Sequence, residues 1–234
     1  RSSTEAVILF QAKPTQDNVY RPYIARITLS SNTATLASVR EVTGFPSGDL
    51  TTGNIEDLSF GIVTSNNTAR IAFGGRSAIG TDPFQVYYTR VGLDNATVVG
   101  TPIQLSSLDN TVGLRPLPSL RLDTLNRSHI AWAVDDSIFG TAPIYYAMVK
   151  ETSGIDNRVI SATQVLTGVF RWGFPSLQVF NNSSIVVIAA DENAGNIGFV
   201  NFNPDADNQD GSPVRVATNT SFFITPPGEL ILPD

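Results

Sequence analysis

The sequence predicts an all-β fold of repeated antiparallel sheets, and three observations predict it. Short runs rich in β-branched and aromatic residues recur along the 234 residues and are bounded by Gly, Pro, Asn or Asp. No stretch with the helical spacing of apolar residues competes with them. The runs also return in a fixed order at a nearly constant interval, which indicates a repeat architecture.

Four kinds of strand can be recognised in order along the chain. The clearest copies are 6–10, 69–73, 128–132 and 184–188, whose last residues are 63, 59 and 56 positions apart. A second apolar strand follows each copy, at 22–27, 86–91, 144–149 and 197–202. A third follows at 39–42, 102–105, 163–166 and 213–216. Leading strands precede three of the copies, at 58–62, 118–122 and 175–179.

Four strands per repeat describe the blade of a propeller, whose sheets must stack because a single sheet leaves apolar faces uncovered. A β-sandwich is the alternative. We predict one domain, 1–234, with repeats at about 1–44, 57–106, 117–167 and 174–218. The first repeat lacks a leading strand, and segment 228–232 matches the pattern of one. The expected fold is therefore a four-bladed antiparallel β-propeller, with its N-terminal blade completed by the C-terminal strand, in cis or from a neighbouring subunit.

One segment runs Leu117-Pro-Ser-Leu-Arg-Leu-Asp-Thr-Leu-Asn-Arg-Ser-His-Ile-Ala-Trp132 and is followed by Pro143-Ile-Tyr-Tyr-Ala147, with looser copies at 174–179 and 69–73. This pattern resembles the repeat of sialidase-like (BNR-type) β-propellers. The Asp-box of that family (Ser-x-Asp-x-Gly-x-Thr-Trp) is absent, and active sialidases have more blades than four repeats provide. The resemblance therefore implies the fold and a non-catalytic extracellular role, in recognition or structure, and no catalytic residue is carried over.

Composition excludes several classes of function. A net charge of -6 argues against a nucleic-acid partner, which needs a basic surface. No apolar stretch approaches the roughly 20 residues of a membrane helix, so no membrane span is expected. There is no cysteine and one histidine, which excludes disulfides and the usual zinc sites. His129 lies inside a predicted strand, where we expect a structural role, and no cofactor is expected.

Six Asn-x-Ser/Thr sequons favour a secreted or cell-surface glycoprotein, because they accept glycans only in a secretory context. They are Asn66, Asn95, Asn126, Asn181, Asn182 and Asn219. Asn is also favoured in tight hairpins, so these triplets can arise without modification. All but Asn219, which is expected in a crossover, fall in turns that share one side of the predicted blades. Glycans there would leave the other side free for contacts.

The other side of the blades is expected to hold the candidate binding residues, in the long loops. Lys13, Arg76, Asp135 and Asp191 follow the copies 6–10, 69–73, 128–132 and 184–188 at matching positions, with Asp136 and Glu192 adjacent. Arg171 and Trp172 come from the crossover 167–174. Aromatic faces beside carboxylates and guanidinium groups suit a sugar ring or an extended peptide. The alternative is that the carboxylates cap loops and that Trp172 packs between blades.

A weak metal candidate is the acidic turn with Asp205, Asp207 and Asp210, whose carboxylates suit a hard cation such as Ca²⁺. The turn lacks the glycine and the terminal glutamate of an EF-hand loop, so a solvated acidic turn is the preferred interpretation.

These observations lead us to expect a protein that is not an enzyme. It would be a building block of an extracellular assembly, with strand exchange between its own copies, or a module that recognises an extracellular glycan or protein. The alternative is a carbohydrate-binding lectin or a glycosidase-like propeller that uses the long-loop side. Glycoside hydrolysis needs two suitably spaced carboxylates, and Asp135, Asp136, Asp191 and Glu192 could supply them.

Overall fold

The computed structural model describes residues 4–12, 21–44, 56–63, 67–75, 85–107, 118–133, 143–166, 172–181, 184–191, 196–205 and 214–223. Every regular element in these ranges is a strand, which confirms the all-β prediction. The strands form four separate antiparallel sheets. Within the described ranges, no helix has the length and apolar character needed to cross a membrane.

The sheets are numbered here in chain order. Sheet 1 contains β1 (Glu5–Ala12), β2 (Arg21–Ser30) and β3 (Thr33–Glu41). Sheet 2 contains β4 (Glu56–Val63), β5 (Thr68–Gly75), β6 (Gln85–Gly92) and β7 (Thr97–Gln104). Sheet 3 contains β8 (Pro118–Leu122), β9 (Ser128–Ala133), β10 (Ile144–Thr152) and β11 (Ile155–Leu166). Sheet 4 contains β12 (Trp172–Asn181), β13 (Ser184–Asp191), β14 (Asn196–Asn203) and β15 (Val214–Phe223).

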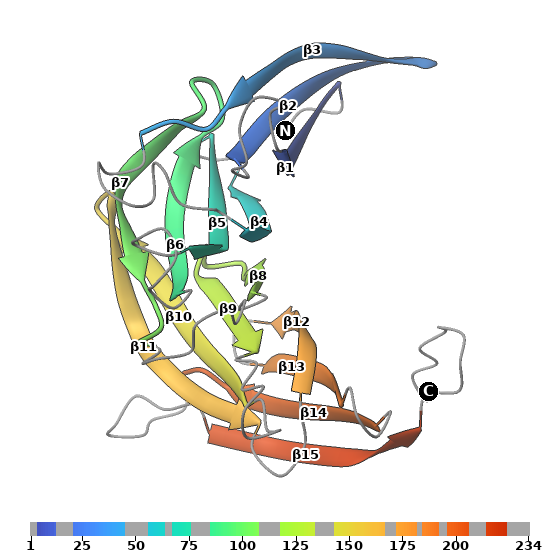
Figure 1. Cartoon of the computed structure of the whole chain (residues 1–234), viewed down its shortest axis with the longest axis vertical. Coiled ribbons are helices and arrows are strands. Elements are labelled where there is room, and N and C mark those ends of the chain that lie inside the picture. The colour runs from blue at the N-terminus through green and yellow to red at the C-terminus, as the bar shows by residue number, and fades with distance from the viewer. Residues whose placement is uncertain are drawn as a thin grey trace.

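The sheets follow one another along a crescent, with β1, β4, β8 and β12 nearest its concave side (Figure 1). Each sheet contacts the next, through β1 and β4, through β4 and β8, and through β8, β9 and β12. Sheets 1 and 4 lie at opposite ends of the crescent. The expected four-bladed ring is therefore not confirmed, because the four sheets trace only part of a circle. The expected closing strand, 228–232, lies outside the described residues.

Three apolar clusters fill the junctions between consecutive sheets. In the first, Leu9, Ile24 and Val42 of the first repeat pack on sheet 2. In the second, sheet 2 packs on Leu120, Ile130 and Trp132. The third joins sheet 3 to sheet 4. The core is thus divided among the junctions, as expected for stacked sheets that each have two apolar faces.

The outer strands are longer than their sequence predicts. β11 spans 12 residues and pairs with β10 along most of its length, where the apolar pattern marks only 163–166. The outer strand β3 is mostly exposed, so its ladder needs no apolar alternation to be stable. For the same reason Asn219, expected in a crossover, lies within β15 as the register partner of Phe199.

The register of sheet 4 differs by one residue from the predicted alignment. Leu120 of β8 pairs with Ile130, and the matching Leu177 of β12 pairs with Val187. The copy of 128–132 in sheet 4 is therefore 185–189; the predicted strand 184–188 lies within β13, but its alignment with the other repeats is off by one residue. Apolar residues fill consecutive positions of β13, so alternation could not fix which of them faces sheet 3.

Candidate functional site

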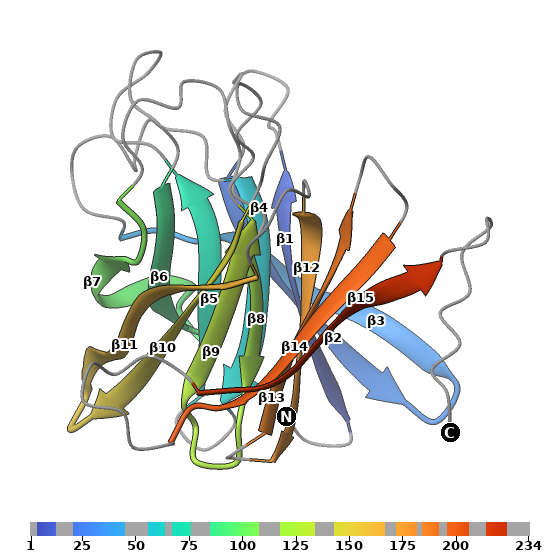
Figure 2. The ribbon, with the colours of Figure 1, turned by 90° about the horizontal axis from the view of Figure 1, so that it is seen from below.

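One edge of the molecule collects the strand ends expected to carry the binding residues. β1, β5, β9 and β13 end at this edge, and the antiparallel partners β2, β6, β10 and β14 begin there (Figure 2). Trp172 and Asp191 are register partners at the ends of β12 and β13, so the structure brings these two candidates together. The other candidates, Lys13, Arg76, Asp135, Asp136, Arg171 and Glu192, lie outside the described residues. We call this border the strand-end edge.

The corrected register changes which candidates match between sheets. Ile8, Ile71, Ile130 and Val187 occupy the same place in the four sheets, opposite Ala25, Thr89, Ala147 and Val200. Lys13, Arg76 and Asp135 each follow this position by the same number of residues, and in sheet 4 that residue is Glu192, where Asp191 was expected. The set therefore keeps two cations, from sheets 1 and 2, and two carboxylates, from sheets 3 and 4.

Stacked aromatic pairs support the strand-end edge in three sheets. Phe10 stacks on Tyr23 and Phe73 on Tyr87, with ring centroids 5.6 Å apart in both pairs. Trp132 stacks on Tyr145 at 5.9 Å. Because Phe73 and Trp132 are fully buried, these pairs hold the strand ends rigidly and leave recognition to neighbouring residues.

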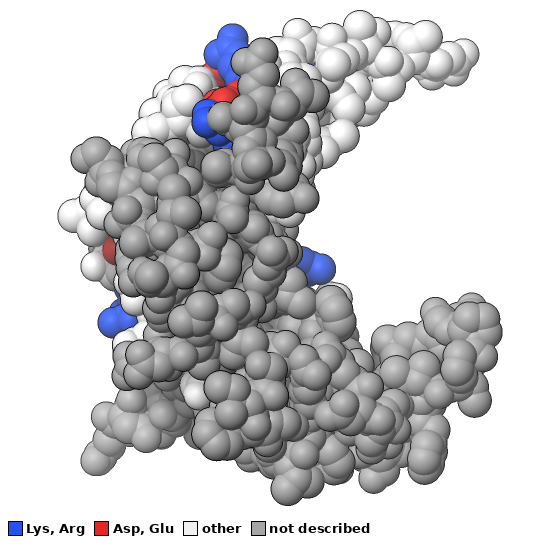
Figure 3. Space-filling model, in the orientation of Figure 1, with Lys and Arg blue, Asp and Glu red and all other residues white. Residues whose placement is uncertain are grey.

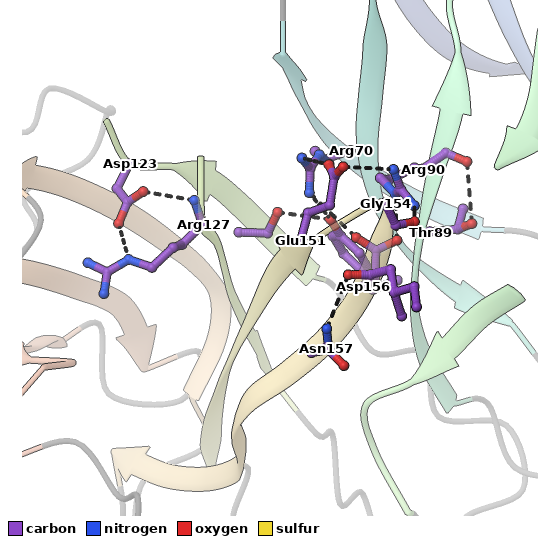
Figure 4. Close-up of polar contacts among 12 residues, drawn as sticks. Arg70, Thr89, Arg90, Asp123, Arg127, Glu151, Gly154, Asp156 and Asn157 are labelled. Carbon is purple, nitrogen blue, oxygen red and sulfur yellow. Dashed lines mark hydrogen bonds and ion pairs between the residues drawn. The ribbon is translucent and has the colours of Figure 1, made fainter. Parts of the chain in front are cut away.

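Two buried polar clusters, drawn in Figure 4, lie between sheets. They involve the β8–β9 turn and the β10–β11 hairpin, which are at the border opposite the strand-end edge. In the first, Arg70 of β5 and Arg90 of β6 face Glu151 and Asp156 of the β10–β11 hairpin. Arg70 Nη2 lies 2.7 Å from Glu151 Oε2, and Arg90 Nε lies 2.6 Å from Asp156 Oδ2. Arg70 also donates to the Tyr88 hydroxyl at 2.9 Å. The cluster pairs two cations with two anions, so no unbalanced charge is buried.

Burial dominates the titration of this first cluster. It raises the pKa of Asp156, because the attraction of Arg90 and Arg70 does not fully offset the loss of hydration. It raises the pKa of Tyr88 as well, against the lowering effect of Arg70. The side chain of Tyr88 is therefore a neutral phenol, whose hydroxyl can donate or accept a hydrogen bond. None of these four charged residues, nor Tyr88, is exposed as a nucleophile.

The second cluster surrounds Asp123, in the turn between β8 and β9. Its Oδ1 accepts hydrogen bonds from the backbone N–H groups of Leu125 (2.9 Å) and Arg127 (2.8 Å). Its Oδ2 accepts from Arg127 Nε at 2.5 Å and lies 3.1 Å from His129 Nε2. The other ring nitrogen of His129, Nδ1, lies 2.7 Å from the Tyr146 hydroxyl. His129 is fully buried with both nitrogens partnered, which is the structural role expected of it.

Protonation in the second cluster follows from its hydrogen bonds. Burial alone would raise the pKa of Asp123, but hydrogen bonds from His129 and Arg127 outweigh it and lower the pKa to about 2. Burial raises the pKa of Tyr146 well above its ordinary value. The carboxylate is thus ionised and the phenol neutral, so His129 donates from Nε2 and accepts at Nδ1 when its ring is neutral.

The metal candidate is partly tested by the same contacts. Arg127 Nη1 pairs with Asp205 Oδ1, which follows β14, and so ties sheet 3 to sheet 4. The carboxylate of Asp205 therefore already has a cationic partner, while Asp207 and Asp210 lie outside the described residues. In the ranges that the structure covers, no group of three or more His, Cys, Asp or Glu side chains could hold a metal ion.

Two sequons can be placed with their side chains. Asn95 and Asn126 are exposed, in the turns that precede β7 and β9, on the border opposite the strand-end edge. Asn126 has a φ of 58°, the left-handed conformation that asparagine tolerates. Asn181 ends β12, and Asn66 and Asn182 lie outside the described residues.

Similar folds occur among solved structures, although no protein-family model and no curated protein matches the sequence. A protein of unknown function from Dyadobacter fermentans has a TM-score of 0.59 and 12% identity, over 95% of this chain and 67% of that one. A PL25 ulvan lyase, solved with -[GlcA(1-4)Rha3S]- bound, has a TM-score of 0.55 and 11% identity, over 92% and 52%. A thermostable family-43 glycoside hydrolase has a TM-score of 0.54 and 15% identity, over 97% and 76%. This chain thus spans about half the length of the ulvan lyase.

These similarities show a propeller-type fold and correct two expectations. The neighbours are glycoside hydrolase and polysaccharide lyase propellers, and a sialidase-like BNR-type relationship is not shown. The expectation that the protein is not an enzyme is contradicted, since a polysaccharide lyase and a glycoside hydrolase share the fold, at identities of 11% and 15%. The error has a physical origin: the repeat pattern records how sheets pack, which binding modules and enzymes share.

Proposed function

We propose that this protein is a carbohydrate-active propeller that binds a polysaccharide at the strand-end edge. The observation that carries the proposal is that four sheets of a fold shared with a polysaccharide lyase and a glycoside hydrolase direct their strand ends to one border. Trp172 and Asp191 are register partners there, so the sequence supplies an aromatic residue and an acidic residue at the same point of the border. That pair offers stacking for a sugar ring and a hydrogen-bond acceptor for its hydroxyls.

The charged residues that follow the strand ends suggest which part of the site binds the substrate and which part cleaves it. Lys13 and Arg76 come directly after β1 and β5, and they suit an acidic sugar. Asp135 and Glu192 occupy the matching positions in the next two sheets, and they suit acid and base roles in glycosidic cleavage. The class of substrate we propose is therefore an extended polysaccharide that contains uronic acid or sulfate groups.

The propeller itself and its setting complete the proposal. Segment 228–232 is proposed to add to the inner edge of β1, which pairs with no further strand among the described residues, as the missing strand of the first blade, from the same chain or a neighbouring copy. The exposed Asn95 and Asn126 suit a secreted glycoprotein, with glycans on the border opposite the proposed site. A mass shift that an N-glycosidase removes, after expression through a secretory pathway, would test the last point.

The binding experiment uses Trp172→Ala and a matched control on the same strand. Affinity electrophoresis against neutral, uronate-containing and sulfated polysaccharides should show retardation that Trp172→Ala reduces about tenfold or more. Phe180→Ala removes an aromatic side chain that is 71% exposed at the other end of β12, and it should leave binding unchanged. Equal loss in both variants, or no retardation by any polysaccharide, would refute the proposed site.

Turnover is measured separately. Release of reducing ends, or of unsaturated products, from the retained polysaccharide should disappear in Asp135→Asn and Glu192→Gln while binding persists. Binding without any turnover in the wild-type protein would leave a lectin as the function of this edge.

A further inference from the structure

The three junctions between consecutive sheets are built in the same way, and sheets 1 and 4 each have one outer face that takes part in no such junction. Each junction has an apolar cluster and an ion pair from one sheet to an acid in, or just beyond, the turn after the third strand of the next. Arg26 of β2 pairs with Asp94 at 2.9 Å, Arg90 with Asp156 at 2.6 Å, and Arg127 with Asp205. This repetition allows the unpaired faces of sheets 1 and 4 to be compared with their buried counterparts.

The outer face of sheet 1 is largely apolar and partly exposed, with one ion pair, Arg21 to Glu41, at its end toward the strand-end edge. Ile8, Ala25 and Val39 lie in register across it. Ile8 is 46% exposed, whereas the matching Ile71, Ile130 and Val187 are 1%, 0% and 0% exposed, because each packs on the preceding sheet. The same face carries Leu29, Leu36 and Val39 at 38%, 60% and 48% exposure.

No charged residue occurs between Ile27 and Val39, and the projecting β2–β3 hairpin is free of charged atoms in the space-filling view (Figure 3). An exposed apolar patch of this kind marks an interaction surface rather than a solvated one. We call the exposed side of sheet 1 the leading face.

At the other end of the crescent, sheet 4 exposes the face that in sheets 1 to 3 is covered by the next sheet. Val186 and Ile188 point away from sheet 3 and are only partly buried. Residues at the place of Ile188 in the first three sheets, Leu9, Ala72 and Ala131, are at most 6% exposed, because the next sheet covers them. We call this side of sheet 4 the trailing face. At each of the three junctions within the chain, the face of one sheet that corresponds to the trailing face packs on the face of the next sheet that corresponds to the leading face.

At the places of the internal ion pairs, the two end faces carry no charged residue. Asn201 of β14 occupies the place of Arg26 and Arg90. The turn between β2 and β3 reads Ser30-Ser-Asn-Thr33 and has no acid where the other sheets have Asp94, Asp156 and Asp205. A cation or an anion on one face alone would be buried without a partner, at a high cost in free energy. The two faces are therefore electrostatically matched to each other.

We propose that the trailing face of one molecule packs on the leading face of a second copy, head to tail. Sheets 1 and 4 of one chain stand at opposite ends of the crescent, so two molecules are needed to bring the faces together in this arrangement (Figure 1). Such a contact repeats the internal junction in its apolar part and is heterologous, so it extends the crescent from copy to copy. The surface is independent of the strand-end edge and of the proposed polysaccharide site.

Sedimentation equilibrium over a range of concentrations tests the contact. The wild-type protein should show an average mass that rises with concentration, and Ile8→Arg and Leu36→Arg should raise the dissociation constant about tenfold or more. The matched control is Ile155→Arg, at a side chain that is 65% exposed on the outer strand of sheet 3, and its association should equal that of wild type. A monomer at every concentration, or equal effects of all three variants, would overturn the proposal.

Two substitutions that introduce opposite charges, one on each face, test whether these two faces meet. Asn201→Arg and Asn32→Asp should each weaken association, since each buries one unpaired charge at the contact. The two substitutions together should restore association, because they recreate the ion pair of the internal junctions. If the two substitutions together stabilise the monomer, and this effect does not depend on protein concentration, the two faces meet within one chain. That result would refute the proposed contact with a second copy. The absence of any coupling would refute the pairing of these faces.

Discussion

At the scale of single residues, the carboxylate of Asp123 connects burial with acid stability. Its pKa of about 2 lies below the ordinary 3.8, so the ionised form stabilises the folded state above the ordinary value and that stability is lost as pH falls through about 2. Asp123→Asn should lower the free energy of unfolding by about 2 kcal/mol near neutral pH. Urea unfolding should show this deficit shrinking at pH values below 3.8.

Asp94→Asn is the control for that measurement. The side chain of Asp94 is 64% exposed and pairs with Arg26, so its loss should cost at most about 1 kcal/mol. A deficit for Asp123→Asn that stays constant as pH falls would contradict the assignment of the low pKa.

The sequence indicates some of these residues and hides others. A single histidine within a strand already pointed to a structural role for His129, and its two partnered nitrogens explain why. The importance of Asp123 was missed, because its turn reads like any polar loop and Asp205 is far away in the chain. At the strand-end edge, the pattern found the matching charges but assigned Asp191 where the register places Glu192, since β13 is apolar on both faces.

At the scale of elements, the ion pairs between β5 and β10 hold the junction of sheets 2 and 3. Arg70 is 1% exposed and Glu151 22%, so removal of either charge leaves the other in a poorly hydrated place with only a more distant partner, Asp156 at 3.6 Å from Arg70 or Arg90 at 3.4 Å from Glu151. Arg70→Met should cost about 3–5 kcal/mol, and Arg70→Met combined with Glu151→Gln should cost less than that single change. A double-mutant cycle by chemical denaturation measures this coupling.

Tyr88 offers a check on that cycle. Tyr88→Phe removes only the hydroxyl, which accepts from Arg70 and shares a hydrogen bond with Ser128 Oγ at 3.1 Å, and its cost should be about 1–2 kcal/mol, as expected for two hydrogen bonds. If Arg70→Met and Tyr88→Phe cost the same, the ion pairs contribute nothing and the junction is held by its apolar cluster.

Element boundaries show where apolar pattern stops being informative. The inner and middle strands have buried faces, and their predicted positions agree with β5, β6, β8 and β9. The outer strands β3 and β11 extend far beyond the predicted runs, because backbone hydrogen bonds to β2 and β10 hold them while their side chains face solvent. Polar residues such as Asn157 therefore give no sign that they lie in a strand.

At the scale of the whole molecule, the sequence repeat predicts four sheets but does not determine whether they close into a ring. The number of sheets follows from periodic strands, which are local in sequence. Closure depends on the angle between sheets, and that angle is set by the side chains of the apolar cluster at each junction, such as the one that holds Leu9 and Ile71 and the one that holds Ala72 and Ile130. Pattern alone therefore could not distinguish a closed ring from the observed crescent.

The crescent predicts a gradient of stability along the chain. Sheets 2 and 3 are covered on both faces, whereas sheet 1 is covered on one face and its ion pair between Arg26 and Asp94 is partly exposed. Local opening is easiest where few apolar contacts are lost, so amides of β1–β3 should exchange hydrogen faster than those of β5, β6, β9 and β10. Hydrogen exchange with mass spectrometry on a dilute sample measures this order, with Ile155→Arg as a control that should not alter it. Protection of sheet 1 equal to that of sheets 2 and 3 at low concentration would mean that its exposed face is covered within the single chain.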